Sequence, residues 1–410
     1  FEMKNKRKQM KKIIKLSVAA ALAATAMNAA VVDNVKMSGK AKLWYETNDS
    51  AGNSYFDQAN STGQVMIDVA ASADIGPVKI NLENTTATTL GLEQAVVSAS
   101  RVGGSTDTQN YTGIANISTT IGGTTLVAGK QALNTPFCFT EAWNAHKNTF
   151  NAGVLVNNSL IPNTTIVLAD VKTTNALDIT AASTAAGEEV GAKGQLTYDG
   201  EFNTDLNAKY VGLTTKIAGA TVNASFTDVD GNNHASVKAT GTWIDAAAKV
   251  ANANVKVTYA ELDPATGDTS NAHAIAVSTK VAGLNVMAAY SKVSDDNNGL
   301  AFGNIATTFK KTKLPTAGVY TDGQYVAQMD SKAMKIKVSG IKLGSVALAA
   351  QYVDCDNDTT AAKNTSELDV FATTKIAGIA TKVIYMHRDM PAGTTGGDQD
   401  KIRVIASYSF

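Results

Sequence analysis

The chain contains little of what disulfide-stabilised, metal-binding or nucleic-acid-binding proteins need. Its 410 residues include two cysteines and four histidines, too few for a disulfide scaffold and without the spacing of metal ligands. Basic and acidic residues balance at 36 each, so no net positive field indicates nucleic acid as a partner. Neither a Gly-x-Ser-x-Gly elbow nor a phosphate-binding Gly-Lys-Ser/Thr loop occurs. The sequence therefore predicts no enzyme.

Long apolar runs are also missing. The run 16–27 is too short to span a bilayer, which takes about 20 residues, and no other segment is a candidate for a transmembrane helix. It follows the basic stretch 10–15 and precedes small residues at 28–30, a layout typical of a secretory signal peptide. A buried N-terminal helix is the alternative, which the neighbouring lysines disfavour. We expect residues 1–30 to be a cleaved signal peptide and residues 31–410 to form a single domain.

The chain does contain strand-like alternation of apolar and polar residues. Segments 222–226, 284–290, 334–339 and 401–410 place apolar side chains at every second position, hence on one face of a strand. Strands of about ten residues have the length that a tilted strand needs to cross a bilayer. We count about eighteen such strands, an even number, as single-chain bacterial barrels have. Two places leave the count open: 190–199 competes with 206–217 for one strand, and 299–328 is either a loop or an extra strand.

The connections between these strands are alternately short and long. Three short ones share the phrase Thr-Lys-Ile/Val-Ala-Gly, at 215–219, 279–283 and 374–378, where glycine can supply the positive φ of a tight hairpin. The long connections are mostly polar. A β-sandwich would also alternate, but its turns would not sort in this way. The sequence predicts an all-β fold, a transmembrane antiparallel β-barrel of about 18 strands with short periplasmic turns, long external loops and a water-filled channel.

The third long connection differs from the others. Segment 129–147 carries two phenylalanines, a tryptophan and mixed charges, begins Gly-Lys-Gln-x-Leu-Asn-Thr and is followed by Val-Asn-Asn-Ser at 156–159. With the signal peptide and the terminal Phe410, these motifs resemble the major outer membrane porins of Campylobacter-type bacteria. The resemblance implies a homotrimer of eighteen-stranded barrels in the outer membrane of a Gram-negative bacterium. It also implies an inward-folded third loop with acidic residues, and in some members a calcium ion, at the constriction.

By this resemblance and by position, loop 133–148 and its flanks would form the constriction. The candidate residues are Lys130, Glu141, His146, Lys147 and Asp170. If Val167, Ala169 and Val171 face lipid, Asp170 turns inward. Glu141 and Asp170 are the candidate calcium ligands, although two carboxylates supply only part of the six to eight oxygens that calcium takes. The alternative, that both are ordinary solvated loop and wall residues, stays open.

Further candidates follow from alternation and position. Basic residues expected in the lumen, where they can tune ion selectivity, are Lys36, Lys40, Lys42, Lys256, Lys335, Lys337, Lys382, Lys401 and Arg403. Asp68, Asp74 and Glu83 face the same way, so the sign of the selectivity stays open. We expect Trp143 to pack the third loop against the wall, and Trp44 and Trp243 to lie near the membrane interface.

The last candidates are the cysteines and the C-terminal aromatic residues. Cys138 and Cys355 both fall in expected external loops, so they form either a disulfide or two free thiols. Tyr408 and Phe410 end the last strand, and we expect them to be the signal that the barrel-assembly machinery recognises.

Together these features predict a general diffusion porin without catalytic residues or a required cofactor. Ions and small hydrophilic solutes would pass through a barrel that sits in outer-membrane lipid and is narrowed by loop 133–148. One alternative is a surface adhesin or structural outer-membrane protein whose long loops bind external ligands, with the barrel as an anchor. Another is a secreted all-β adhesin of stacked sandwiches.

Overall fold

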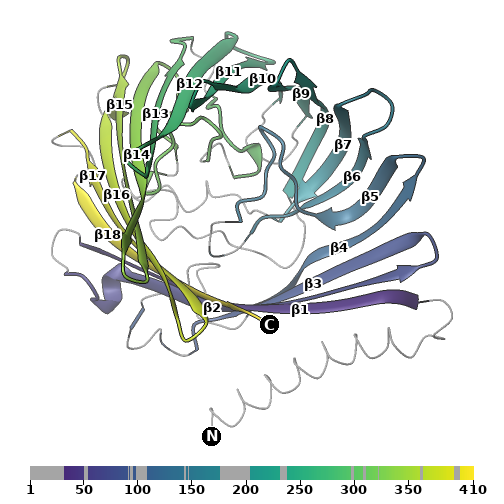
Figure 1. Ribbon diagram of the computed structural model, residues 1–410, viewed down its shortest axis with the longest axis horizontal. Coiled ribbons are helices and arrows are strands. Elements are labelled where there is room, and N and C mark those ends of the chain that lie inside the picture. The colour runs from purple at the N-terminus through teal and green to yellow at the C-terminus, as the bar shows by residue number, and fades with distance from the viewer. Residues whose placement is uncertain are drawn as a thin grey trace, which may run out of the picture.

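A computed structural model describes most of the chain. The described residues are 32–49, 54–90, 92, 96–97, 109–142, 145, 147–175, 204–230, 238–296, 300–307, 311–321, 323–360, 363–391 and 398–410. They form an antiparallel sheet of 18 strands, in which β1 pairs with both β2 and β18 and so closes a barrel (Figure 1). The predicted fold class and strand number are confirmed. The expected signal peptide, residues 1–30, lies outside the described residues.

Each strand pairs with its neighbours in chain order. The strands are β1 (Val32–Asp49), β2 (Ser61–Ile75), β3 (Val78–Thr88), β4 (Gln109–Ile121), β5 (Thr124–Gln131), β6 (Phe150–Asn157), β7 (Thr164–Thr174), β8 (Thr204–Ile217), β9 (Ala220–Asp230), β10 (Lys238–Val250), β11 (Ala253–Pro264), β12 (Ser270–Val281), β13 (Leu284–Val293), β14 (Ser331–Leu343), β15 (Val346–Asn357), β16 (Thr365–Ile376), β17 (Ile379–Asp389) and β18 (Gln399–Ser409). Two short 3-10 helices, η1 (Gln58–Asn60) and η4 (Ile305–Thr307), lie in connections.

The two places where the strand count was open are now decided. Segment 206–217 belongs to β8, and the competing segment 190–199 lies outside the described residues. The described part of 299–328 contains no strand, only η4 and irregular chain. No helix in the described part of the chain is long and apolar enough to cross a membrane.

The short turns have the conformation that the repeated phrase predicts. The Ala-Gly pairs at 218–219, 282–283 and 377–378 have φ angles of 49° and 82°, 50° and 83°, and 50° and 84°. Two successive positive φ values define a type I′ turn, whose twist matches that of the flanking strands. The second position is glycine, which takes this conformation without steric cost. The shared phrase therefore produces the same type of hairpin turn at three places in the chain.

Alternation along the strands separates an outer from an inner face. Large apolar residues such as Ile117, Leu126, Val211 and Ile336 are exposed on the outer face. Their outer position is what a lipid-facing barrel surface requires. The inner face differs from one part of the barrel to another, and this difference shapes the candidate site.

Candidate functional site

Two segments of the chain fold into the barrel. The first inward segment, residues 132–149, connects β5 to β6, and the second inward segment, residues 294–330, connects β13 to β14. Figure 1 shows both inside the ring of strands. The first is the predicted third loop, and its inward fold is confirmed. The second was not predicted, although its apolar residues, including Phe302, Ile305 and Leu314, set it apart from the polar loops.

The first inward segment packs against β10. The ring of Phe137, which is 1% exposed, meets Trp243 edge-on with 5.8 Å between ring centroids. Gly241 on the same strand leaves room for this ring, because a Cβ there would lie 2.6 Å from its Cε2. Trp243 is therefore a lumen residue, as is Trp44, which packs with Met66, Ala87 and the inward Ala145. The expectation that both tryptophans lie at the membrane interface is wrong, because inserted chain buries their rings.

The other end of the first inward segment is fixed to the wall formed by β1 and β3. Lys42 Nζ donates a hydrogen bond of 3.1 Å to the carbonyl oxygen of Ala145. Lys147 forms an ion pair of 2.6 Å with Glu83 on β3. The segment thus reaches from β10 to the opposite side of the barrel. Trp143 and His146, which were expected to pack the loop and to line the constriction, lie outside the described residues.

The second inward segment is anchored on β16 by Glu367. The backbone N–H groups of Val319, Tyr320 and Thr321 and the Thr321 hydroxyl all donate hydrogen bonds to its buried carboxylate. Three successive N–H groups around one carboxylate form an anion-binding nest. Lys335 Nζ adds a hydrogen bond of 2.5 Å to the carbonyl oxygen of Ala317. Sequence periodicity gives no sign of this anchor, since it depends on a loop meeting a strand far along the chain.

Between these anchors the two segments share an apolar cluster with the strands β6 to β13. The inner wall contributes many alanines, among them Ala152, Ala169, Ala208, Ala260 and Ala272, between larger residues such as Phe150 and Leu262. The inserted chain contributes larger ones, among them Leu133, Phe137, Phe302, Ile305 and Leu314. Close packing of this kind keeps water out of the cluster itself. We call this region the packed half of the lumen.

The inner face of β14 to β18 and β1 carries basic side chains, several of which stack on aromatic rings. Lys337 and Lys382 lie 5.5 and 5.0 Å from the ring centre of Phe371. Arg388 and Lys401 lie 4.5 and 3.8 Å from the ring centre of Tyr320. Such cation–π contacts hold a charge in place without neutralising it. We call this inner surface the basic wall.

Contacts or register place the basic residues that were expected in the lumen on the inner face. Arg403 stacks on Trp44 and pairs with Glu46 at 2.5 Å. Lys256 pairs with Asp245 beside Trp243 at 3.4 Å. The inward residues of this set are Lys36, Lys40, Lys42, Lys256, Lys335, Lys337, Lys382, Lys401 and Arg403. A cavity of about 410 Å³ beside the first inward segment is lined in part by Lys40, Lys42 and Lys147.

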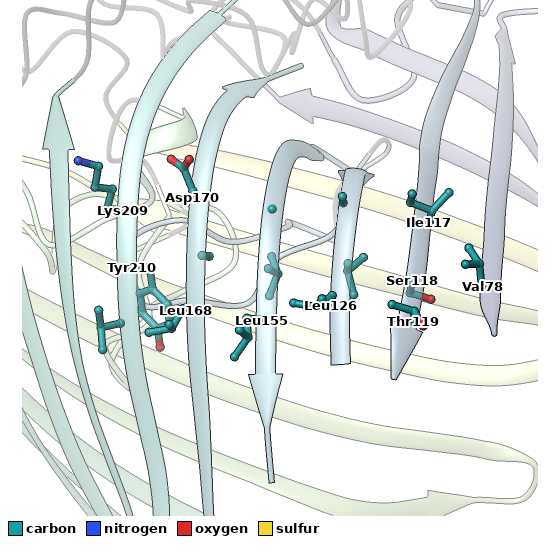
Figure 2. A pocket seen from close by; sticks show the side chains of 16 residues that line it. Val78, Ile117, Ser118, Thr119, Leu126, Leu155, Leu168, Asp170, Lys209 and Tyr210 are labelled. Carbon is teal, nitrogen blue, oxygen red and sulfur yellow. The ribbon is translucent and has the colours of Figure 1, made fainter. Parts of the chain in front are cut away.

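Asp170 lies on the outer face, so its predicted inward orientation is wrong. Its neighbours Ala169 and Val171, 7% and 1% exposed, belong to the packed half, and Asp170 itself pairs with Lys172 at 2.8 Å. Figure 2 shows Asp170 and Lys209 at one end of an outer-face groove of about 680 Å³ whose walls include Leu126 and Leu168. Ala169 and Val171 face inserted protein instead of lipid, which is why alternation indicated the wrong face.

Two other constriction candidates are also placed differently than predicted. The register sets Lys130 opposite Ala115, which in turn is opposite the exposed Leu82, so Lys130 lies on the outer side. Glu141 is in the lumen but only 1% exposed, and its Oε1 accepts a hydrogen bond of 2.9 Å from Asn304. It joins the two inward segments and does not face a passage.

The predicted calcium pair is wrong for the same reason. Glu141 is buried inside the barrel and Asp170 is on the outer face, so the two carboxylates cannot share an ion. Among the described residues no group of three or more His, Cys, Asp or Glu side chains is placed to hold a metal.

The cysteines are free, so the disulfide alternative is wrong. Cys138 is buried in the packed half, and burial raises the pKa of its thiol to about 12. Cys355 lies in β15, not in a loop, and packs with Val326 and Val353 in a separate cluster.

Tyr408 and Phe410 lie exposed on the outer face, as the alternation predicts. Their rings stack with 6.2 Å between centroids. The backbone of Phe410 exchanges hydrogen bonds of 2.7 and 2.9 Å with Gly39 on β1. The terminal residue therefore takes part in closing the barrel; a role in recognition by assembly machinery stays a prediction.

Comparison with known proteins shows the fold and no closer relationship. No protein-family model and no curated protein sequence matches the chain. Among solved structures, OccK3 (OpdO) of Pseudomonas aeruginosa has a TM-score of 0.69 at 12% identity and covers 93% of this chain and 96% of its own. OccAB1 of Acinetobacter baumannii has 0.68 at 15%, covering 93% and 97%. OccK8 (OprE) of Pseudomonas aeruginosa has 0.66 at 13%, covering 93% and 99%.

Proposed function

We propose that the protein is a diffusion porin of the outer membrane of a Gram-negative bacterium. It would pass ions and small hydrophilic solutes without catalysis. A closed barrel of 18 strands with an apolar outer face supports this, since barrels of this size enclose a channel. The solved structures that share the fold are outer membrane porins.

The observation that carries the proposal is the unequal filling of the lumen. The packed half is closed by apolar contacts, so the passage runs along the basic wall and past the cavity lined by Lys40, Lys42 and Lys147. Glu46 is neutralised by Arg403 and Glu367 is enclosed by N–H groups. The remaining basic side chains outnumber the free carboxylates along this passage. A ring of like charges favours the opposite ion, so the passage prefers anions.

The finer parts of the proposal are supported by the sequence. Membership of the Campylobacter-type porin family, and the homotrimer that it implies, are supported by the motifs at 129–135 and 156–159. Cleavage of residues 1–30 and recognition of Tyr408 and Phe410 by assembly machinery are supported by the sequence layout at the two ends.

Single-channel recording tests the proposed function. Folded protein, extracted in detergent without heating, is placed in a planar bilayer with a salt gradient across it. Stepwise openings with a reversal potential of the anion-selective sign are expected. If folded protein reproducibly gives no openings, the porin function is wrong, and the surface adhesin or structural protein becomes the better explanation. Openings with cation selectivity would contradict only the proposed passage along the basic wall, and not the porin function.

A further inference from the structure

We infer that the side-chain amide of Asn304 holds the two inward segments together and thereby confines the passage to the basic wall. The inference rests on the proposed function and identifies the residue that positions its constriction. Asn304 lies in the second inward segment directly before η4 and is 0% exposed. The two anchors act on the segments separately, since Glu367 holds the second inward segment on β16 and Lys147 holds the first on β3.

The polar atoms of the Asn304 side chain all bond to the first inward segment. Its Oδ1 accepts a hydrogen bond of 3.2 Å from the N–H of Phe139. Its Nδ2 donates to the carbonyl oxygen of Phe139 at 2.8 Å and to Glu141 Oε1 at 2.9 Å. An amide that pairs with both the N–H and the C=O of one residue makes the two hydrogen bonds that a residue of a neighbouring strand would make. Hydrogen bonds to an ionised carboxylate are stronger than those to a neutral acceptor.

Asn148 shapes the stretch that Asn304 binds. Its Oδ1 accepts a hydrogen bond of 2.7 Å from the N–H of Glu141, and its Nδ2 donates to the carbonyl oxygen of Phe139 at 3.0 Å. Asn148 belongs to the first inward segment, so these bonds hold one segment in shape, whereas those of Asn304 join two segments. The carbonyl of Phe139 accepts from both amides, one on each lone pair.

Among the described residues, two further polar contacts join the segments beside the apolar cluster that they share. The N–H of Ile305 donates a bond of 2.8 Å to the carbonyl oxygen of Phe137. Lys313 contacts Asn134 and lies 4.9 Å from the ring centre of Phe139. Lys313 is a long and only half-buried side chain, so water can replace its bonds. The fully buried amide of Asn304 has no such substitute, because a buried polar group left unpaired is costly.

Loss of this clamp changes the route through the barrel. Glu367 would still hold the second inward segment and Lys147 the first. The two segments would therefore separate from each other where they meet. The opening would face the small alanine side chains of the packed half, which carry no charge. Conductance should rise while the preference for anions falls, and this combination distinguishes clamp failure from simple widening of the basic passage.

The test is the Asn304→Asp variant, which keeps the shape but places a carboxylate against Glu141. The fraction of time spent in a wider, less selective state should rise about tenfold, the change that loss of one hydrogen bond produces. Adding Glu141→Gln exchanges donor and acceptor between the two positions. The double variant should recover most of the wild-type conductance and reversal potential. Recovery is incomplete because the Phe139 carbonyl keeps its bond from Asn148 but still lacks the bond from residue 304.

The matched control is Asn157→Asp, whose amide bonds to Thr124 at the short-turn end of β6 and not to an inward segment. It should behave as wild type. Wild-type conductance in Asn304→Asp, or no recovery in the double variant, would overturn the inference and leave the proposed function intact. A silent wild-type protein would instead overturn the proposed function. If Asn304→Asp does not fold, restored folding in the double variant supports the pairing, and failure to restore it contradicts the pairing.

Discussion

The packed half and the basic wall belong to one sheet and follow one alternation, yet they differ in the size of their inward side chains. Along β6 to β13 the inner positions are often alanine, and inserted Phe137, Phe302 and Leu314 fill the space. Along β14 to β18 and β1 they include lysine, arginine and aromatic residues. Small wall residues leave room for large inserted side chains, whereas long charged ones fill more of the space themselves. Wall side-chain volume thus decides where a barrel is filled and where it conducts.

Removing part of the first inward segment should have the largest effect on the difference between the packed half and the basic wall. Deletion of residues 137–146 takes away the aromatic and apolar groups that fill the packed half, so this side of the lumen should fill with water. Single-channel conductance should rise more than in any point variant. Shortening the exposed connection 265–269 between β11 and β12 is the control and should leave conductance unchanged. An unchanged conductance after the 137–146 deletion would mean that the first inward segment does not narrow the channel.

Removing charges from the basic wall tests whether this part of the lumen sets the ion selectivity. Each of Lys40, Lys337 and Lys382 attracts an anion at 4 Å by about 1 kcal/mol in water. The triple change to Gln should therefore move the reversal potential in a salt gradient strongly toward zero. The control changes Lys172, Lys209 and Lys238 on the outer face to Gln, which removes the same net charge. Equal shifts in the two triple variants would argue against a passage along the basic wall.

A pair of glycine substitutions should separate the packed half from the outer face. Gly241→Ala would put a Cβ 2.6 Å from the ring of Phe137, so the ring must move at a cost of about 1–3 kcal/mol. Gly153→Ala on the outer face of β6 meets nothing within 4 Å. Heat-induced unfolding in detergent, followed by gel mobility, should show a lower midpoint only for Gly241→Ala. Equal midpoints would mean that Phe137 is not tightly packed.

The smallest expected effect is a pH step from Lys313. Burial lowers the pKa of this lysine to about 8, assisted by nearby Lys256 and opposed by Asp245. A lowered pKa means that the amine loses its proton as pH rises through 8, so one positive charge leaves the lumen. Anion preference should decline slightly between pH 7 and pH 9, as seen in the reversal potential. Lys313→Gln should make this step smaller, and a step of unchanged size would have another origin.

The barrel could be predicted from the sequence because the features that indicate it are local. Alternation within a strand and the Ala-Gly turn at 218–219 each depend on a few neighbouring residues. Alternation defines two faces of a strand but does not say which one is inward. Asp170 shows the consequence: Ala169 and Val171 are apolar because inserted protein covers them, so the assumption that apolar means lipid-facing reversed the strand.

The contents of the lumen depend on contacts between distant parts of the chain. Glu141 was identified as a special residue of the third loop, but its partner Asn304 belongs to a segment with no periodic signal. Trp44 and Trp243 suit a membrane interface by residue type, and only the inserted chain reveals them as lumen residues. The sequence therefore predicts the barrel better than the segments that fill its lumen.

The nest around Glu367 has a consequence for the electrostatic potential of the channel. A buried carboxylate beside so many lysines would ordinarily cancel one of them through an ion pair. Here the N–H dipoles of residues 319–321 solvate it instead, and dipoles carry no net charge. The second inward segment thus stabilises the carboxylate without a direct ion pair, so the ammonium groups of the adjacent lysines stay available for contact with passing solutes.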